Sequence, residues 1–199
     1  MSLQTTMARP RAFDEQQVVQ RALEVFWHKG YHAASMNDLL DATALSKSSL
    51  YDSFGSKQAL VIEALRCYAV ALMSGPLAAL AEPDAGRAAI ERTLKTVAAR
   101  ALTPDGQRGC FVNSCMTEVA PHDPEVLAAA RAVVQQLEAA LAAAVRRGQQ
   151  DGSITRSEPA RALARHLVNT LSGINLAAKS KPAKAVLDDI VRVALRALD

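Results

Sequence analysis

Residues 35–60, SMNDLLDATALSKSSLYDSFGSKQAL, contain the pattern that decides the fold. Ser35 and Asp38 have the spacing of a capping box, in which a hydroxyl and an acidic side chain each bind a backbone N–H at a helix start. This spacing predicts a short helix over residues 36–43. Residues 44 and 45 are expected to form the tight turn that follows it.

A third helix is expected directly after this turn, with Ser46 as its cap and a span of residues 47–54. Leu50 and Phe54 are four residues apart, so they share one face and pack inward. A longer helix, from Asp14 to near Gly30, precedes the pair. Two short helices joined by a tight turn behind a longer helix are typical of a helix-turn-helix, whose second short helix enters the major groove of DNA.

The full pattern is Ala22-x-x-x-Phe26-x-x-x-Gly30-Tyr31, Ser35-x-x-Asp38-Leu39 and Leu45-Ser46-Lys47-Ser48-Ser49-Leu50-Tyr51-x-x-Phe54-x-Ser56-Lys57-x-x-Leu60. Over about residues 11–60, the chain resembles the TetR/AcrR family of transcriptional regulators. The resemblance implies a homodimer, three N-terminal helices that bind a palindromic operator, and a ligand pocket in the C-terminal part. It also implies that Tyr51 and Lys57 contact the phosphate backbone.

Polar side chains on the third helix and near its ends are the candidate DNA contacts. Together with one arginine of the N-terminal arm they are Arg11, Ser35, Lys47, Ser48, Ser49, Tyr51 and Lys57. The alternatives are that Tyr51 is a packed surface aromatic and that Lys57 is a solvated lysine. A further alternative is a plain helical core in which the serines only cap a helix.

Two positions depart from the family pattern. Ala44 stands where the family often has glycine, and alanine there costs roughly 1 kcal/mol if its φ is positive. Asp52 stands where the family often has histidine or another neutral residue. An acid near phosphates should weaken non-specific binding, unless it accepts a hydrogen bond from cytosine.

The remaining chain also predicts helices. Over the full sequence, half of the residues are hydrophobic and only 4% are aromatic, and alanine and leucine, which favour helices, are abundant. Further helices are expected over 57–74, 84–103 and 109–119, from Asp123-Pro124 to Gly152, from Ser157-Glu158-Pro159, and from Pro182. We therefore expect an all-α fold of about nine helices. Its expected parts are a flexible arm (1–12), a DNA-binding domain (13–58, helix-turn-helix 36–54), and a ligand-binding and dimerisation domain (59–199).

Charge alone does not indicate DNA binding. The net charge is +3, and residues 1–60 contain six basic and six acidic side chains. The sequence shows no signal peptide and no long uncharged apolar run, and its three cysteines form no CxxC pair. We therefore expect a cytoplasmic protein that contacts no membrane. No motif predicts a metal or a cofactor.

Cys110 is the candidate sensor. It lies at the expected start of a helix beside Arg108, and both features lower the pKa of a thiol. The Gly109-Cys110 pair resembles a NemR-like subset of the family, in which the cysteine senses electrophiles or oxidants. The alternative is a small buried apolar residue. Asn113 and Ser114 are polar residues in an apolar helix, and they are expected either to orient a ligand or to face solvent.

The last two helices have apolar stripes, expected either to pair with a second subunit or to lie in the chain's own core. Together these features predict a repressor that an unidentified small molecule or a thiol modification releases from its operator. One rival is a thiol-dependent enzyme, although no catalytic spacing supports it. The other is a helical binding protein that has lost its affinity for DNA.

Overall fold

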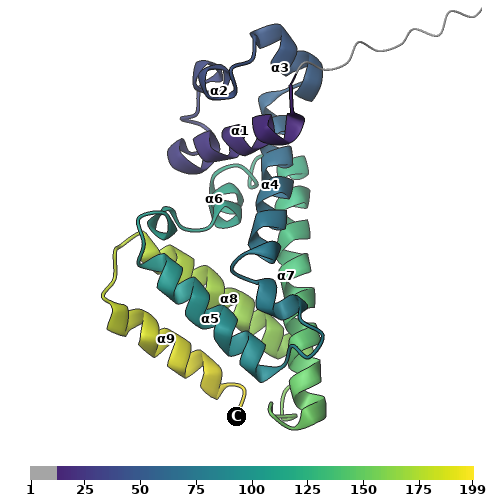
Figure 1. Ribbon diagram of the computed structural model, residues 1–199, viewed down its shortest axis with the longest axis vertical. Helices are drawn as coiled ribbons and strands as arrows, with labels where there is room; N and C mark the ends of the chain where they lie inside the picture. The colour runs from purple at the N-terminus through teal and green to yellow at the C-terminus, as the bar shows by residue number, and fades with distance from the viewer. Residues whose placement is uncertain (1–12) are drawn as a thin grey trace, which may run out of the picture.

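The computed structural model describes residues 13–199, so the predicted flexible arm and Arg11 lie outside the described residues. The described part contains nine α-helices and two 3₁₀ turns and no strand, which confirms the all-α prediction (Figure 1). The helices are α1 Glu15–Lys29, α2 Met36–Thr43, α3 Lys47–Phe54, α4 Lys57–Ser74, α5 Arg87–Ala101, α6 Phe111–Glu118, α7 Pro124–Asp151, α8 Ala160–Ala178 and α9 Lys184–Arg196.

Side-chain caps fix the first four helices at the predicted residues. Asp14, Ser35, Ser46 and Ser56 each accept backbone N–H bonds at the starts of α1, α2, α3 and α4. At Ser35 the complete capping box forms, because Asp38 also binds the Ser35 backbone N–H. These local bonds satisfy donors that a helix start leaves unpaired. The helix-turn-helix therefore has the predicted bounds.

Ala44 has a left-handed backbone, with φ 57° and ψ 26°. This conformation brings the Cβ of an L-residue close to the following carbonyl oxygen. We expect Ala44→Gly to raise the free energy of unfolding by about 0.5–1 kcal/mol, less than the full relief of strain because glycine also gains entropy in the unfolded chain. Chemical denaturation measures this change. An unchanged or lower stability would contradict the expectation.

Three later helices begin after their predicted starts. Residue 84 lies in a turn, and α5 begins at Arg87 with Gly86 as its N-cap. Pro159 is the N-cap of α8 and not its first helical residue, and α9 begins two residues after Pro182. No side chain caps these three helices, so the sequence around them contains only weak start signals.

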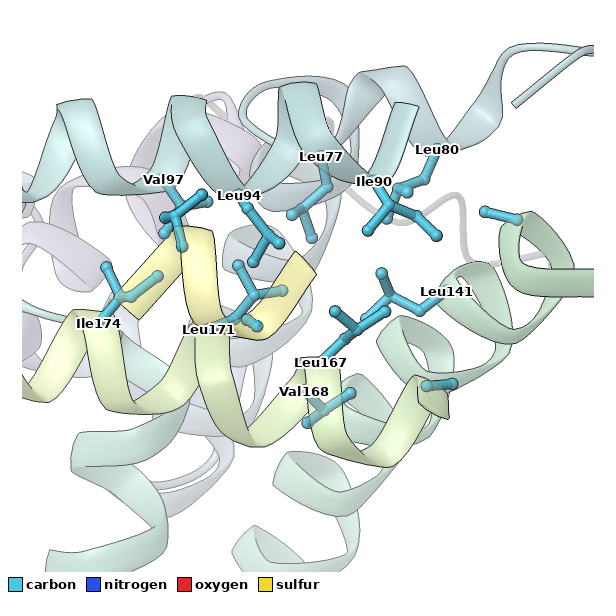
Figure 2. Close-up of a cluster of buried hydrophobic side chains, with 14 of the residues drawn as sticks. Leu77, Leu80, Ile90, Leu94, Val97, Leu141, Leu167, Val168, Leu171 and Ile174 are labelled. Carbon is cyan, nitrogen blue, oxygen red and sulfur yellow. The ribbon is translucent and has the colours of Figure 1, made fainter. Parts of the chain in front are cut away.

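The molecule has two apolar clusters, one at each end of the long helices α4 and α7. We call them the lower and the upper cluster by their places in Figure 1. The lower cluster joins α5, α7, α8 and α9, and Figure 2 shows Leu94, Leu167 and Leu171 meeting at its centre. The upper cluster joins α1 to α4 with α6 and the first half of α7. It includes Phe26 and Leu50 of the helix-turn-helix half together with Phe111 of α6. The N-terminal helices therefore do not have a core of their own.

The predicted stripes of α8 and α9 lie in this lower cluster. Leu163, Leu167 and Leu171 of α8 are buried, as are Leu187 and Val191 of α9. The apolar stripes on which the prediction of a subunit interface was based are therefore mostly part of the chain's own core. A partner subunit would have to contact other faces of the same two helices.

By length and composition alone, α7 is also apolar enough to cross a membrane. In this fold it packs against α4, α6 and α8, and a core helix of a helical protein has the same composition.

Candidate DNA interface and sensor pocket

α3 lies at one end of the molecule, the opposite end from α9 (Figure 1). Leu50 is fully buried on its inner side. The hydroxyl of Ser46 accepts the Ser49 backbone N–H at 3.1 Å and shares hydrogen bonds with the hydroxyls of Ser48 and Ser49 at 3.0 and 2.9 Å. Packing and capping together hold α3 rigidly, which a helix that enters a groove requires.

The outer side of α3 is polar and open. Tyr51 is 39% exposed, and Lys47, Ser48 and Asp52 are also exposed, whereas Ser49 is half-buried. Their side chains can therefore reach a surface that approaches α3 from outside. This arrangement is the one expected of a recognition helix.

Ser35 is exposed, and its hydroxyl both donates and accepts a hydrogen bond within the chain. It donates to Asp38 Oδ2 at 2.8 Å and accepts the Asp38 N–H at 3.1 Å. Asp38 also accepts from Lys29 Nζ at 2.5 Å, and mainly this bond, together with those from Ser35, lowers its pKa to about 2. The network joins the end of α1 to the start of α2. Ser35 therefore fixes the position of α2, whatever else it contacts.

Lys57 is half-buried at the first residue of α4. Its Nζ lies 4.5 Å from the ring centroid of Tyr31, a cation–π contact. Burial lowers the pKa of Lys57, whereas attraction to Glu118 and Asp38 acts in the opposite direction. A cation is unfavourable at a helix N-terminus, so the tyrosine ring and these carboxylates compensate for its position.

Two contacts attach α6 and the turn before it to α1. Arg108, the last residue of the 3₁₀ turn Gly106–Arg108, pairs with Glu24 of α1 at 2.5 Å, and its guanidinium lies 4.2 Å from the ring centroid of Trp27. Glu118, the last residue of α6, accepts the backbone N–H groups of Tyr31 and His32 at 3.1 and 2.7 Å. Both bonded N–H groups belong to the turn between α1 and α2. α6 therefore touches the helix-turn-helix half at both of its ends.

Cys110 is the N-cap of α6 and lines a small cavity of about 50 Å³ between α4, α6, α7 and α8. The hydroxyl of Tyr68 donates to its sulfur at 3.6 Å. The other polar side chains that line the cavity are Asn113, Ser172 and Asn175, and its remaining lining is apolar. A cavity of this size holds one or two water molecules, far less than the roughly 300–1,000 Å³ of most ligand pockets.

Asn113 and Ser114, predicted together with Cys110 as sensor residues, lie in different surroundings. Asn113 lines the cavity and donates to the Ser172 carbonyl oxygen at 3.4 Å. Ser114 does not line it, and its hydroxyl donates to the Cys110 carbonyl oxygen at 3.3 Å within its own helix. The sequence did not predict Tyr68 as a residue of this cavity. Its position on the apolar face of the helix over residues 57–74 was the only signal of it.

The other two thiols differ in exposure, because Cys115 is buried whereas Cys67 is half-buried and lines a surface hollow between α1 and α4. Burial raises the pKa of Cys67, whose sulfur donates to Gln20 at 3.1 Å, and burial raises the pKa of Cys115 to about 12. Both shifts disfavour the thiolate, which is the reactive form of a cysteine. In the described part of the chain, no three His, Cys, Asp or Glu side chains gather as a metal site.

Larger hollows lie on the surface, between α5 and α9 (about 740 Å³) and between α1 and α4 (about 870 Å³). Neither contains a predicted sensor residue. The smaller cavity combines an apolar wall with converging polar groups, as ligand sites do.

A capped recognition helix presented at one end of a larger helical body defines a helix-turn-helix DNA-binding regulator. The chain belongs to the TetR family. Residues 18–64 match the family model for bacterial regulatory proteins of the tetR family, and residues 86–194 match that for the tetracyclin repressor-like C-terminal domain. The family consists of transcriptional regulators and not enzymes, so the thiol-enzyme alternative is dropped.

Named relatives support this assignment over the whole chain. The HTH-type transcriptional regulator YezE of Bacillus subtilis (strain 168) is 29% identical over 97% of this chain and 100% of its own length. The HTH-type transcriptional repressor DhaR of Mycobacterium sp. (strain GP1) is 27% identical over 92% of this chain and 91% of its own.

Solved structures have the same fold. A cysteine-substituted variant of the TetR family regulator CifR, in complex with double-strand operator DNA, is 32% identical with a TM-score of 0.81, over 96% of this chain and 100% of that one. Reduced NemR of E. coli matches with a TM-score of 0.82 at 19% identity, over 94% and 98% of the two chains. The NemR likeness concerns the fold alone.

Proposed function

We propose that this regulator is a homodimeric, cytoplasmic repressor that binds a palindromic operator and leaves it when the C-terminal part is modified or occupied. The observation that supports the DNA-binding part of this proposal is the exposed polar side of α3, opposite buried Leu50. Repression is supported by relatives named as repressors, DhaR among them.

The predicted DNA contacts keep their roles in this proposal. Lys47, Tyr51 and Lys57 bind phosphates, and Ser48 and Ser49 allow the close approach of α3 to the bases. The proposal also includes two other residues, Ser35 at the capped start of α2 and Arg11 in the arm outside the described residues.

The dimer would form through the outer faces of α8 and α9. Leu176 is 69% exposed on α8, and Val186 and Val193 are about half-exposed on α9. Gly173, one turn before Leu176, has open space where a Cβ would stand, so a partner helix could approach closely. Apolar residues and a glycine on adjacent faces suit a four-helix interface about a two-fold axis. Such an axis would place the two recognition helices about 34–36 Å apart, one turn of DNA.

The sensing step would act through α6. Any group attached to Cys110 would overfill a cavity of about 50 Å³, and close-packed interiors do not absorb extra volume without movement. The N-cap of α6 would move first. Its other end, Glu118, holds the turn between α1 and α2, so movement of α6 changes the position of the helix-turn-helix.

Phosphate contacts predict the outcome of a binding experiment. With an operator selected from a random duplex library, we expect Tyr51→Ala and Lys57→Ala to weaken binding to all sequences alike. Lys57→Ala should also lower the slope of log affinity against log salt by about 1. Lys95→Ala, which removes the same charge at an exposed residue of α5, is the control. Unchanged affinity in both test variants would contradict the DNA-facing assignment.

Thiol chemistry predicts a second outcome. We expect N-ethylmaleimide to release the wild-type protein and its Cys67→Ser variant from the operator, and to leave Cys110→Ser bound. Fluorescence anisotropy of labelled operator measures release, and mass spectrometry locates the adduct. Release of Cys110→Ser would remove that cysteine from the mechanism.

A further inference from the structure

Asp52 is the most outward-pointing residue of α3. Leu50 and Phe54 face the core. Successive residues of a helix are rotated by about 100° around its axis, so Asp52 lies roughly 180° around the axis from the direction midway between these two side chains. Ser48 lies one turn before it on the same side, whereas Tyr51 lies about 100° round the helix. If α3 enters a groove with this outer side, Asp52 faces the groove floor and Tyr51 faces its wall.

The carboxylate of Asp52 has no partner within the described residues. It is exposed and makes no hydrogen bond or ion pair there, unlike Asp38, which binds Lys29 and Ser35. A free carboxylate at the centre of a DNA-facing surface is repelled by phosphates. This repulsion is offset only if the carboxylate finds a hydrogen-bond donor at the bottom of the groove.

The major groove offers such a donor in only two places, the N4 amino group of cytosine and the N6 amino group of adenine. In adenine the amino group lies beside the N7 acceptor, which repels a carboxylate, whereas guanine and thymine offer acceptors at the corresponding positions. α3 is short, about 12 Å long, and the groove is about 12 Å wide, so its sixth residue also lies inside the groove.

We infer that Asp52 reads a cytosine in each half-site of the operator. This inference rests on the proposed function, because it requires α3 to lie in the major groove. In a symmetric dimer the two Asp52 carboxylates read the same base pair in both halves of the palindrome. The aspartate makes the regulator discriminate between sequences at the expense of general affinity for DNA.

The test compares base preferences of purified full-length variants in a random duplex selection. At one position of each half-site, the wild type should select cytosine and lose roughly 5- to 150-fold in affinity when a C·G pair is replaced by T·A. Asp52→Ala should bind all four base pairs at that position alike, and Asp52→Asn should favour adenine, which the asparagine amide can bind with two hydrogen bonds.

Asp41→Ala is the matched control, because it removes an exposed acid of α2 and should leave every base preference unchanged. Equal preferences in the wild type and Asp52→Ala would overturn this inference while leaving DNA binding intact. If the wild type selects no sequence at all, the proposed function fails, and the inference fails with it.

Discussion

We expect Leu176→Asp to convert the proposed dimer into monomers and to lower affinity for a palindromic operator by about 100-fold or more. A carboxylate at this place would be buried without a partner in the α8–α9 interface, which is strongly unfavourable. A monomer also loses the gain of roughly 10²- to 10⁴-fold that comes from linking two half-site contacts. Light scattering measures the mass, and anisotropy with the full palindrome measures the affinity.

Val70→Asp is the control for this prediction. Val70 on α4 is 70% exposed, against 69% for Leu176, so the two variants place the same charge at equally open apolar sites. Val70→Asp should stay dimeric and bind the operator. The reverse result, with Val70→Asp monomeric and Leu176→Asp dimeric, would place the interface on α4 and not on α8.

We expect Glu118→Ala to abolish the proposed response of operator binding to modification of Cys110. Coupling between two sites typically changes affinity by about 5- to 150-fold, and we expect a wild-type ratio in this range between untreated and maleimide-treated protein. Without the Glu118 carboxylate, the N–H groups of Tyr31 and His32 lose their link to α6, and the ratio falls to about 1.

Glu118→Gln should give an intermediate ratio, because the amide retains one acceptor oxygen without the charge. Glu91→Gln, at a half-buried residue of α5 that pairs with Lys95 and has no part in this link, should respond like the wild type. Thermal melting of all three variants shows whether each is folded at the temperature of the assay. A full response in Glu118→Ala would place the coupling in another contact, such as the Arg108–Glu24 pair.

The features that the sequence predicted best depend on neighbouring residues. The bounds of α2 and α3 follow from Ser35 and Ser46, whose hydroxyls bind N–H groups three residues away. The predicted start of α8 was too early, because proline is favourable both as an N-cap and in the first turn, and Pro159 is the N-cap. The resemblance of residues 11–60 to a family supplied the class of protein, which composition and charge alone did not.

The features that the sequence could not predict depend on residues that are distant in the sequence, or on which face of a helix is buried in the chain's own core. Glu118 binds Tyr31, 87 residues away, and nothing in the residues around either one indicates the pairing. In α8, Leu167 faces the core and Leu176 faces outward. Periodicity identifies apolar residues on both faces, but it does not say which face meets this chain and which meets a partner.

The shared upper cluster has a consequence for engineering. Phe111 of α6 and Val126 of α7 belong to the same buried cluster as Phe26 and Leu50. An isolated fragment of residues 13–58 would therefore expose apolar surface that α6 and α7 normally cover, and it would not be expected to melt as an independent unit. A chimera that transfers the specificity of this regulator to another scaffold should carry α4, α6 and the first half of α7 along with the recognition helix.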